Sequence, residues 1–184
     1  NRPGAGSTIG MQALAKAAPD GYTIGLGNIA ANAIGPAVQP TPYDPIKDFA
    51  PVSLVGVTPL VLVVNAEKIP AKTVPEFVAY LKANPGKVSF GNSGHNGVAH
   101  LHNELLCSMA GIEGLAVPYK GDAPSIVDLM GGSIQVALPT TVAGLPHVRS
   151  GKLRAIGVTS KKRLESLPDV AAVAETLPGY EAVS

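Results

Sequence analysis

Residues Val88 to Gly111 read VSFGNSGHNGVAHLHNELLCSMAG and combine a short strand, a glycine-broken turn and an amphipathic helix, in that order. Val88 to Phe90 are a β-type run, and apolar residues recur at helical spacing from Val98 until Gly111 supplies a stop. The turn over residues 91–97 therefore opens a helix. The first amides of a helix have no intrahelical partner and carry the positive end of its dipole, so this turn is suited to hold a carboxylate or a phosphate.

The turn itself supplies five candidate ligand-binding residues, Ser93, Gly94, His95, Asn96 and Gly97. Glycines let an anion approach the backbone closely, and the serine, histidine and asparagine side chains add hydrogen-bond donors. An ordinary capped helix after a tight turn explains the same residues without any ligand. Both interpretations stay open at this point.

Three other chemistries fit the turn less well. Gly91 to His95 comes within one residue of the nucleophile elbow G-x-S-x-G, but no acidic residue and then histidine in series is evident downstream to make Ser93 a serine-hydrolase nucleophile. The turn also lacks the Lys-Ser/Thr ending of a phosphate-binding P-loop. On a helix, His100 and His102 lie about 200° apart, so we expect no shared metal ion.

Composition places the 184-residue chain among folded proteins, with 46% hydrophobic and 15% charged residues. A net charge of +1 favours neither nucleic acid nor an anionic membrane surface as a partner. Cys107 is the single cysteine, which argues against a disulfide framework or a cysteine-based metal site. The chain starts at Asn1 without an initiator Met, and we expect it to be an interior piece of a longer protein.

The remaining sequence repeats the order strand, small-residue turn, helix, which predicts an α/β fold with a mostly parallel sheet and helices on both faces. We expect strands over residues 22–27, 52–57, 60–64, 88–90, 115–117, 134–138 and 153–158. We expect helices that begin near Ser7, Thr73, Val98, Asp122 and Thr141, a helical piece over 168–176, and an irregular, proline-rich connection over 36–51.

Several turns that follow expected strands share one chemistry, with amides and hydroxyls but few charges. Asn28 to Asn32 form one such turn. Pro118 to Pro124 form another, with Asp122 as its expected helix N-cap, and Thr140 and Thr141 follow a later strand. Ligands of open α/β sheets gather at the carboxyl ends of strands. This convergence is the main argument from the residues for a binding function.

Short motifs spread in order over essentially the whole chain resemble those of one receptor family. They are NRPGAG at 1–6, APDGYT at 18–23, YDPIKDF at 43–49, FGNSG at 90–94, VPYKG at 117–121, AP at 123–124, DLMGG at 128–132, PH at 146–147, GKLRA at 151–155, VTS at 158–160, LPDV at 167–170 and PGYE at 178–181. Their combination resembles the solute receptors of tripartite tricarboxylate transporters, often called the Bug family.

The resemblance implies a periplasmic receptor with a two-lobed, type II periplasmic-binding-protein-like fold. Such a receptor closes on a small organic mono-, di- or tricarboxylate and delivers it to the membrane subunits of a transporter. It implies neither enzymatic activity nor a cofactor, a metal or a nucleic-acid partner.

The resemblance also implies where the lobes divide. The chain is expected to cross between lobes near Val57 to Leu62 and near Ala155 to Thr159. Residues 1–57 and 158–184 would then form a first, incomplete lobe and residues 58–157 a second. The family's first strand and glycine-rich loop are expected to precede Asn1, and its terminal helices to follow Tyr180.

In this family the ligand is held largely by main-chain amides and bridging waters from loops at strand ends. Carried over by position, the candidates are Ser93, Gly94, His95, Asn96, Gly97, Tyr119, Gly121, Ala123, Thr140 and Thr141 in the second lobe, with Asn28, Ile29 and Ala30 in the first. A ligand-sensing domain of a transcriptional regulator uses a similar two-lobed sheet and is the alternative. It predicts a DNA-binding helix-turn-helix upstream, where a transport receptor carries a signal peptide.

Overall fold

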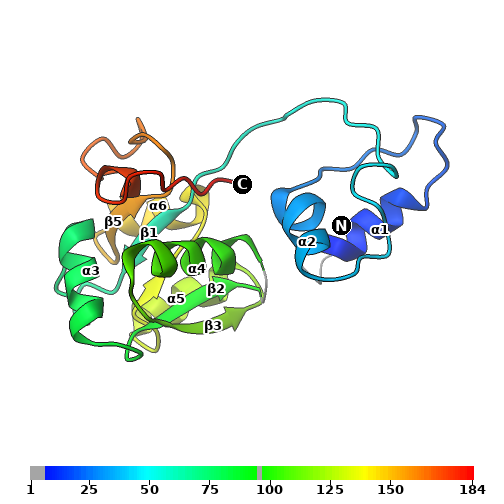
Figure 1. Cartoon of the computed structure of the whole chain (residues 1–184). Helices are drawn as coiled ribbons and strands as arrows, with labels where there is room; N and C mark the ends of the chain where they lie inside the picture. Colours follow the sequence, from blue (N-terminus) through cyan, green and yellow to red (C-terminus); the bar gives the residue numbers. More distant parts are fainter. Residues whose placement is uncertain (1–6, 95–96) are drawn as a thin grey trace.

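A computed structural model describes residues 7–94 and 97–184, and Figure 1 shows a sheet body joined by a long extended segment to a smaller helical region. The helices are α1 (Thr8–Ala15), η2 (Ala30–Ile34, a π-helix), α2 (Gly35–Val38), α3 (Val74–Ala83), α4 (Val98–Ala110), α5 (Asp122–Gly131), α6 (Thr141–Arg149) and η3 (Val173–Glu175, a 3₁₀-helix). The strands are β1 (Val61–Val64), β2 (Ser89–Ser93), β3 (Leu115–Tyr119), β4 (Val136–Ala137) and β5 (Arg154–Val158).

Within the described chain the strands form one sheet in the order β3-β2-β4-β1-β5. Strand β2 pairs in parallel with β3 and β4, whereas β1 pairs antiparallel with β4 and β5. Because β4 and β5 both oppose β1, the other strands of the sheet run in one direction and β1 alone runs against them. The expected mostly parallel sheet is therefore confirmed.

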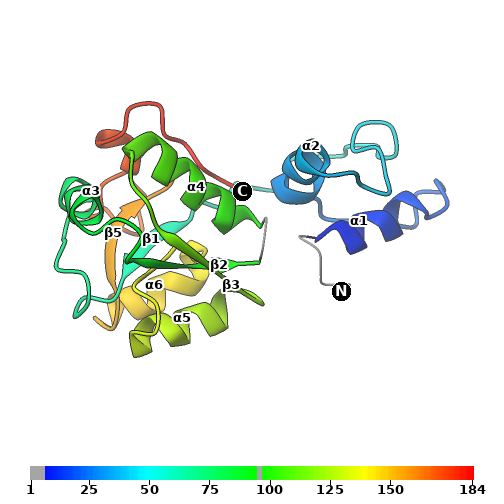
Figure 2. The same ribbon diagram turned by 60° about the horizontal axis from the view of Figure 1, so that its bottom comes forward.

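Helices cover both faces of this sheet, as the burial of β1 shows. Its four residues, VLVV, are all fully buried, as expected for a strand enclosed on both sides. Leu62 and Val64 pack into a core with α3 and α4, and Val61 and Val63 pack into a second core with α5 and α6. Figure 2 shows the two helix layers on either side of the strands.

Several helix boundaries follow the signals read from the sequence. Thr73 caps α3, where its hydroxyl accepts a hydrogen bond from the Glu76 amide at 3.4 Å. Gly111 ends α4 in the left-handed conformation, with φ 61°. Thr140 caps α6 by accepting from the Ala143 amide. None of the helices that the structure describes is long and apolar enough to cross a bilayer.

The two predicted strands at 22–27 and 52–57 are wrong. Both segments are extended but unpaired, and their apolar side chains face solvent: Tyr22 is 93% exposed and Val52 is 92% exposed. A strand needs a neighbouring backbone for its hydrogen bonds, and in the described chain neither segment has one beside it. The predicted helical piece at 168–176 shrinks to the short η3, whose start is capped by the Glu175 side chain.

Residues 159–184 lie on the same body as the sheet. Tyr180 is buried in the core beside α3 and α4, and its hydroxyl donates to the His102 carbonyl at 3.4 Å. The Ser184 amide donates to the Thr58 carbonyl at 3.0 Å. The chain's last described segment therefore packs where the extended segment from the helical region enters the body. The division into two lobes stays a prediction.

Candidate functional site

The helices α4, α5 and α6 begin along one edge of the sheet. Each follows the carboxyl end of a strand: β2 ends at Ser93, β3 ends at Tyr119, and β4 leads through Pro139 to Thr140. These strands run in the same direction, so their ends and the helix N-termini that follow meet at the same side. The arrangement is the one expected from the turns in the sequence.

A pocket of about 350 Å³ opens at this edge, and we call it the strand-end pocket. It is lined by Ser7, Asn28, Ala30, Leu60, Ser93, Gly97, Val98, Ala99, Gly121, Asp122, Thr140 and Ser184. The lining thus combines residues from the helical region with the first turns of the three helices. A second hollow of about 370 Å³ lies among residues 161–181 and contains none of the predicted ligand-binding residues.

The strand-end pocket brings together six of the predicted residues, Ser93, Gly97, Gly121, Thr140, Asn28 and Ala30. Five others are not among its lining residues: Gly94, Tyr119, Ala123, Thr141 and Ile29. His95 and Asn96 lie outside the described residues. The three turns that follow strands β2, β3 and β4 thus meet at one pocket, as expected. Whether these residues contact a ligand stays a prediction.

The turn before α4 depends on two glycines. Gly94 has φ +95°, a conformation that side chains rarely adopt, and its amide donates to the Asn92 carbonyl at 2.9 Å. Gly97 is the N-cap of α4, and a Cβ there would collide with the Ser93 carbonyl oxygen. Val98 and Ala99, in the first turn of α4, line the pocket, so the unpaired amides of this turn are close to whatever the pocket holds.

Asp122 does not cap α5, contrary to the sequence expectation. Gly121, with φ +120°, occupies the N-cap position, and Asp122 is the first residue of the helix. Its Oδ2 instead accepts hydrogen bonds from both the amide and the hydroxyl of Thr140, each at 3.0 Å. The carboxylate thereby joins the starts of α5 and α6. This contact crosses from one turn to another, so a local capping rule could not find it.

Tyr119 is not among the residues that line the pocket, but it holds helix α5 against the end of β3. Its hydroxyl donates to Oδ2 of Asp128 on α5 at 2.7 Å. Desolvation and this carboxylate raise the pKa of Tyr119 to about 12, so the phenol stays protonated and keeps donating at neutral pH. The contact ties the end of β3 to the helix that follows it.

The wall from the helical region is built around Asn28. Its side-chain oxygen accepts from the Ala31 amide at 3.0 Å, and its side-chain nitrogen donates to the Ser7 hydroxyl at 3.1 Å. Its own amide donates to the Asn32 side chain at 3.2 Å. The expected small-residue turn is therefore the entry into η2, held by the Asn28 side chain, with Asn28 and Ala30 among the residues that line the pocket.

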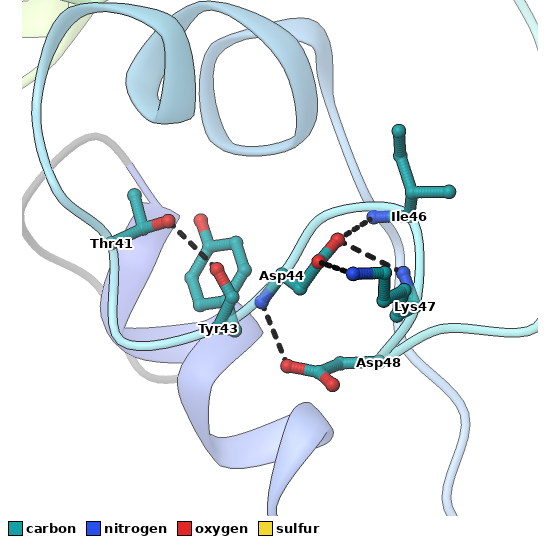
Figure 3. Close-up of polar contacts among 6 residues, drawn as sticks. All are labelled: Thr41, Tyr43, Asp44, Ile46, Lys47 and Asp48. Atoms are coloured by element: carbon teal, nitrogen blue, oxygen red, sulfur yellow. Dashed lines mark hydrogen bonds and ion pairs between the residues drawn. The ribbon is translucent and has the colours of Figure 1, made fainter.

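A second turn, over residues 41–48, anchors this wall and is drawn in Figure 3. Asp44 Oδ1 accepts from the amides of Ile46 and Lys47 at 2.9 and 3.0 Å, and these bonds hold the pKa of Asp44 below its usual value. The ordered turn presents Tyr43, whose hydroxyl donates to the Ala31 carbonyl at 2.7 Å. Tyr43 thus fixes η2 next to the pocket residues.

A buried polar group lies behind Ser93. Asn103 on α4 donates to the side-chain oxygen of Asn92 on β2, and His102 is buried one residue away. Burial lowers the pKa of His102 to about 4, so this imidazole is neutral at physiological pH. Among residues 7–94 and 97–184, no group of three or more His, Cys, Asp or Glu side chains could hold a metal ion.

Charge is distributed unevenly around the strand-end pocket. The lining that the structure describes includes no Lys, Arg or His, and Asp122 is its one ionisable side chain. A bound anion would therefore meet helix amides and hydroxyls rather than a cationic side chain. The sequence did not predict that Asp122 lines this pocket and binds Thr140.

Comparison with known proteins identifies relatives of the whole chain. Residues 1–184 match the family model described as tripartite tricarboxylate transporter family receptor. The protein BugT of Bordetella pertussis is 41% identical over 177 residues, which cover 95% of this chain and 54% of BugT. The chain spans about half the length of the curated relatives it matches.

Two solved structures are similar over nearly all of the chain. The structure described as R. palustris Rpa4515 with adipate has a TM-score of 0.91 and 34% identity, and covers 100% of this chain and 62% of its own. The structure described as MatC from Rhodopseudomonas palustris with bound malate has a TM-score of 0.85 and 29% identity, and covers 98% of this chain and 62% of its own. These likenesses confirm the expected fold class, and the family is one of receptors rather than of enzymes.

Proposed function

The chain belongs to the tripartite tricarboxylate transporter receptor family, and on this premise we propose that it acts as an extracytoplasmic receptor for a small organic carboxylate. In this proposal the strand-end pocket binds the carboxylate, and the loaded receptor delivers it to the membrane subunits of a transporter. The family's members are periplasmic binding proteins, which supports a periplasmic location.

One observation carries the proposal: three helix N-termini line a single pocket whose described lining contains no cationic side chain. Helix amides offer partial positive charge and directed donors to an anion without a buried counter-ion. Two relatives of the same fold were solved with adipate and with malate, both carboxylates. The size of the pocket suits a ligand of that class.

We assign the roles as follows. The turn from Ser93 to Gly97 receives the ligand's carboxylate, and Gly121 and Thr140 close the floor from the next two turns. Asn28 and Ala30 form the opposing wall, which belongs to the first lobe in the predicted division of the chain. Closure of the two walls on the ligand is the conformational step that a membrane partner would recognise.

The test is thermal unfolding of the protein with a panel of mono-, di- and tricarboxylates, with isothermal titration for any acid that stabilises it. A ligand that binds the native state raises its stability, by about 2.7 kcal/mol at a hundredfold excess over Kd. Failure of every acid to shift the transition of a well-folded sample would contradict the proposal.

A glycine pair locates the binding site. Gly97→Ala places a Cβ against the Ser93 carbonyl oxygen and should weaken binding at least about tenfold, because the turn must shift to accommodate it. Gly131→Ala is the matched control, since outside its chain neighbours and the backbone of its own helix no atom lies within 4 Å of the place that its Cβ would take at the end of α5. Equal affinities of the two variants would place the ligand elsewhere.

A further inference from the structure

Asp122 gives the strand-end pocket a negative charge at one end. Asp122 is among the residues that line the pocket, and no Lys, Arg or His among the described lining residues offsets its charge. Thr140 donates two hydrogen bonds to Oδ2, from its amide and its hydroxyl, both at 3.0 Å. The side chain is thus held in place by the turn before α6 and cannot swing away without leaving those donors unpaired.

The contact between Asp122 and Thr140 determines which helix N-terminus is left for a ligand. Asp122 is the first residue of α5 and also satisfies the turn that opens α6, so both of these helix starts already have an anion from the protein itself. Helix α4 has no acidic residue in its first turn. A ligand carboxylate is therefore drawn to the Ser93 and Gly97 side of the pocket, away from Asp122.

The opposite end of the ligand then faces Asp122. A second carboxylate there would meet a like charge in a partly desolvated pocket, which is unfavourable. An ammonium group would meet an opposite charge and donate hydrogen bonds, because a carboxylate has about four acceptor positions and Thr140 occupies two of them.

The geometry points to Asp122 as a specificity-determining residue that selects an amino-carboxylate, with an ammonium group opposite its carboxylate, over a dicarboxylate of the same length. This inference rests on the proposed function and names the substrate class for it. The adipate and malate of the two solved relatives are dicarboxylates, the class that Asp122 would disfavour in this chain.

Matched acid pairs test the inference. Adipate is compared with 5-aminopentanoate and succinate with 3-aminopropanoate, so that within each pair an ammonium replaces one carboxylate on the same methylene chain. Isothermal titration at neutral pH and low salt gives the affinity ratio for the protein. We expect the amino member of at least one pair to bind about tenfold more tightly than its dicarboxylate.

Asp122→Asn removes the charge while its amide oxygen still accepts from Thr140, so the turn keeps a partner. This variant should lose the preference for the amino member or reverse it, a change of about tenfold in the affinity ratio. Glu113→Gln is the matched control: it removes the same charge from an exposed residue before β3, outside the pocket lining, and should leave the ratio unchanged.

The outcomes separate this inference from the proposed function. Tighter binding of the dicarboxylates by the unaltered protein, with a ratio that Asp122→Asn does not change, overturns the role of Asp122 and leaves the carboxylate receptor standing. The same ratio in the Asp122→Asn and Glu113→Gln variants likewise overturns it. Binding of no member of either pair, or of the wider acid panel, overturns both. The ratio in the unaltered protein decides the ligand class even if a variant fails to fold.

Discussion

Strand β1 and the segment 52–57 are both rich in Val and Leu, yet one is buried in the sheet and the other is exposed. All four residues of β1 are fully buried, whereas Val52, Leu54 and Val55 are between 80% and 92% exposed. The difference lies in their neighbours: β1 has β4 on one side and β5 on the other, and no strand in the described chain pairs with 52–57. Apolar β-type sequence becomes a strand only where a second backbone completes its hydrogen bonds.

We expect the largest difference in stability between two matched leucine variants, one in β1 and one in the segment 52–57. Leu62→Ala in β1 should lower the free energy of unfolding by about 2–5 kcal/mol, because it leaves a cavity in a fully packed core. Leu54→Ala, in the exposed segment, should change it by about 0.5 kcal/mol or less. Urea unfolding followed by circular dichroism measures both. Equal losses would mean that Leu54 is buried in solution.

We expect the sheet body and the region 7–57 to differ also in how their stability depends on pH. Burial lowers the pKa of His102 from 6.5 to about 4, so between these values the unfolded chain binds a proton that the native body does not. Stability from neutral His102 is therefore present above pH 6.5, is lost as the pH falls towards 4, and amounts to about 3 kcal/mol at most. His102→Leu should remove this part of the pH dependence in unfolding curves from pH 7 to 4.

The region 7–57 contains no histidine, so it should not share that loss. Its perturbed group is Asp44, whose folded pKa lies below 3.8, so the stability from its hydrogen bonds is lost only as the pH falls below that value. Hydrogen exchange at pH 5 therefore separates the two regions: protection should fall in the body and persist near Asp44. A uniform fall over both would argue against His102 as the cause.

The smallest effect should come from Tyr43→Phe. This change removes the hydroxyl that donates to the Ala31 carbonyl, and it should cost about 1 kcal/mol, confined to the helical region. Hydrogen exchange of the η2 amides should rise while the amides of β1 stay protected. If the body loosened as well, the two regions would be more strongly coupled than their contacts indicate.

How far the sequence predicts the structure differs between the same two regions. In the body, the helix start at Thr73, the stop at Gly111 and the run at 60–64 act locally or through strong burial, and all three are predicted correctly. The strands expected at 22–27 and 52–57 are wrong because pairing is a property of two segments and not of one.

The site shows the same limit. Small residues and helix starts point to Ser93, Gly97 and Thr140, and all three line the strand-end pocket, because glycine-rich turns at helix starts have a local signature. Asp122 is expected to cap its own helix, and its true partner, Thr140, is eighteen residues away. A carboxylate that binds across two turns leaves no periodic or spacing signal in either turn.

The place of β1 in the sheet also constrains the order in which the chain can fold. Val63 lies opposite Ala137 in β4 and Ala155 in β5, so both neighbours of this strand are made long after it. Contacts so distant in sequence close large loops and form slowly. Until β5 has paired with β1, four consecutive aliphatic residues have an open edge, and such edges are prone to aggregation. The strand whose residues become fully buried therefore depends on distant parts of the chain to close both of its edges.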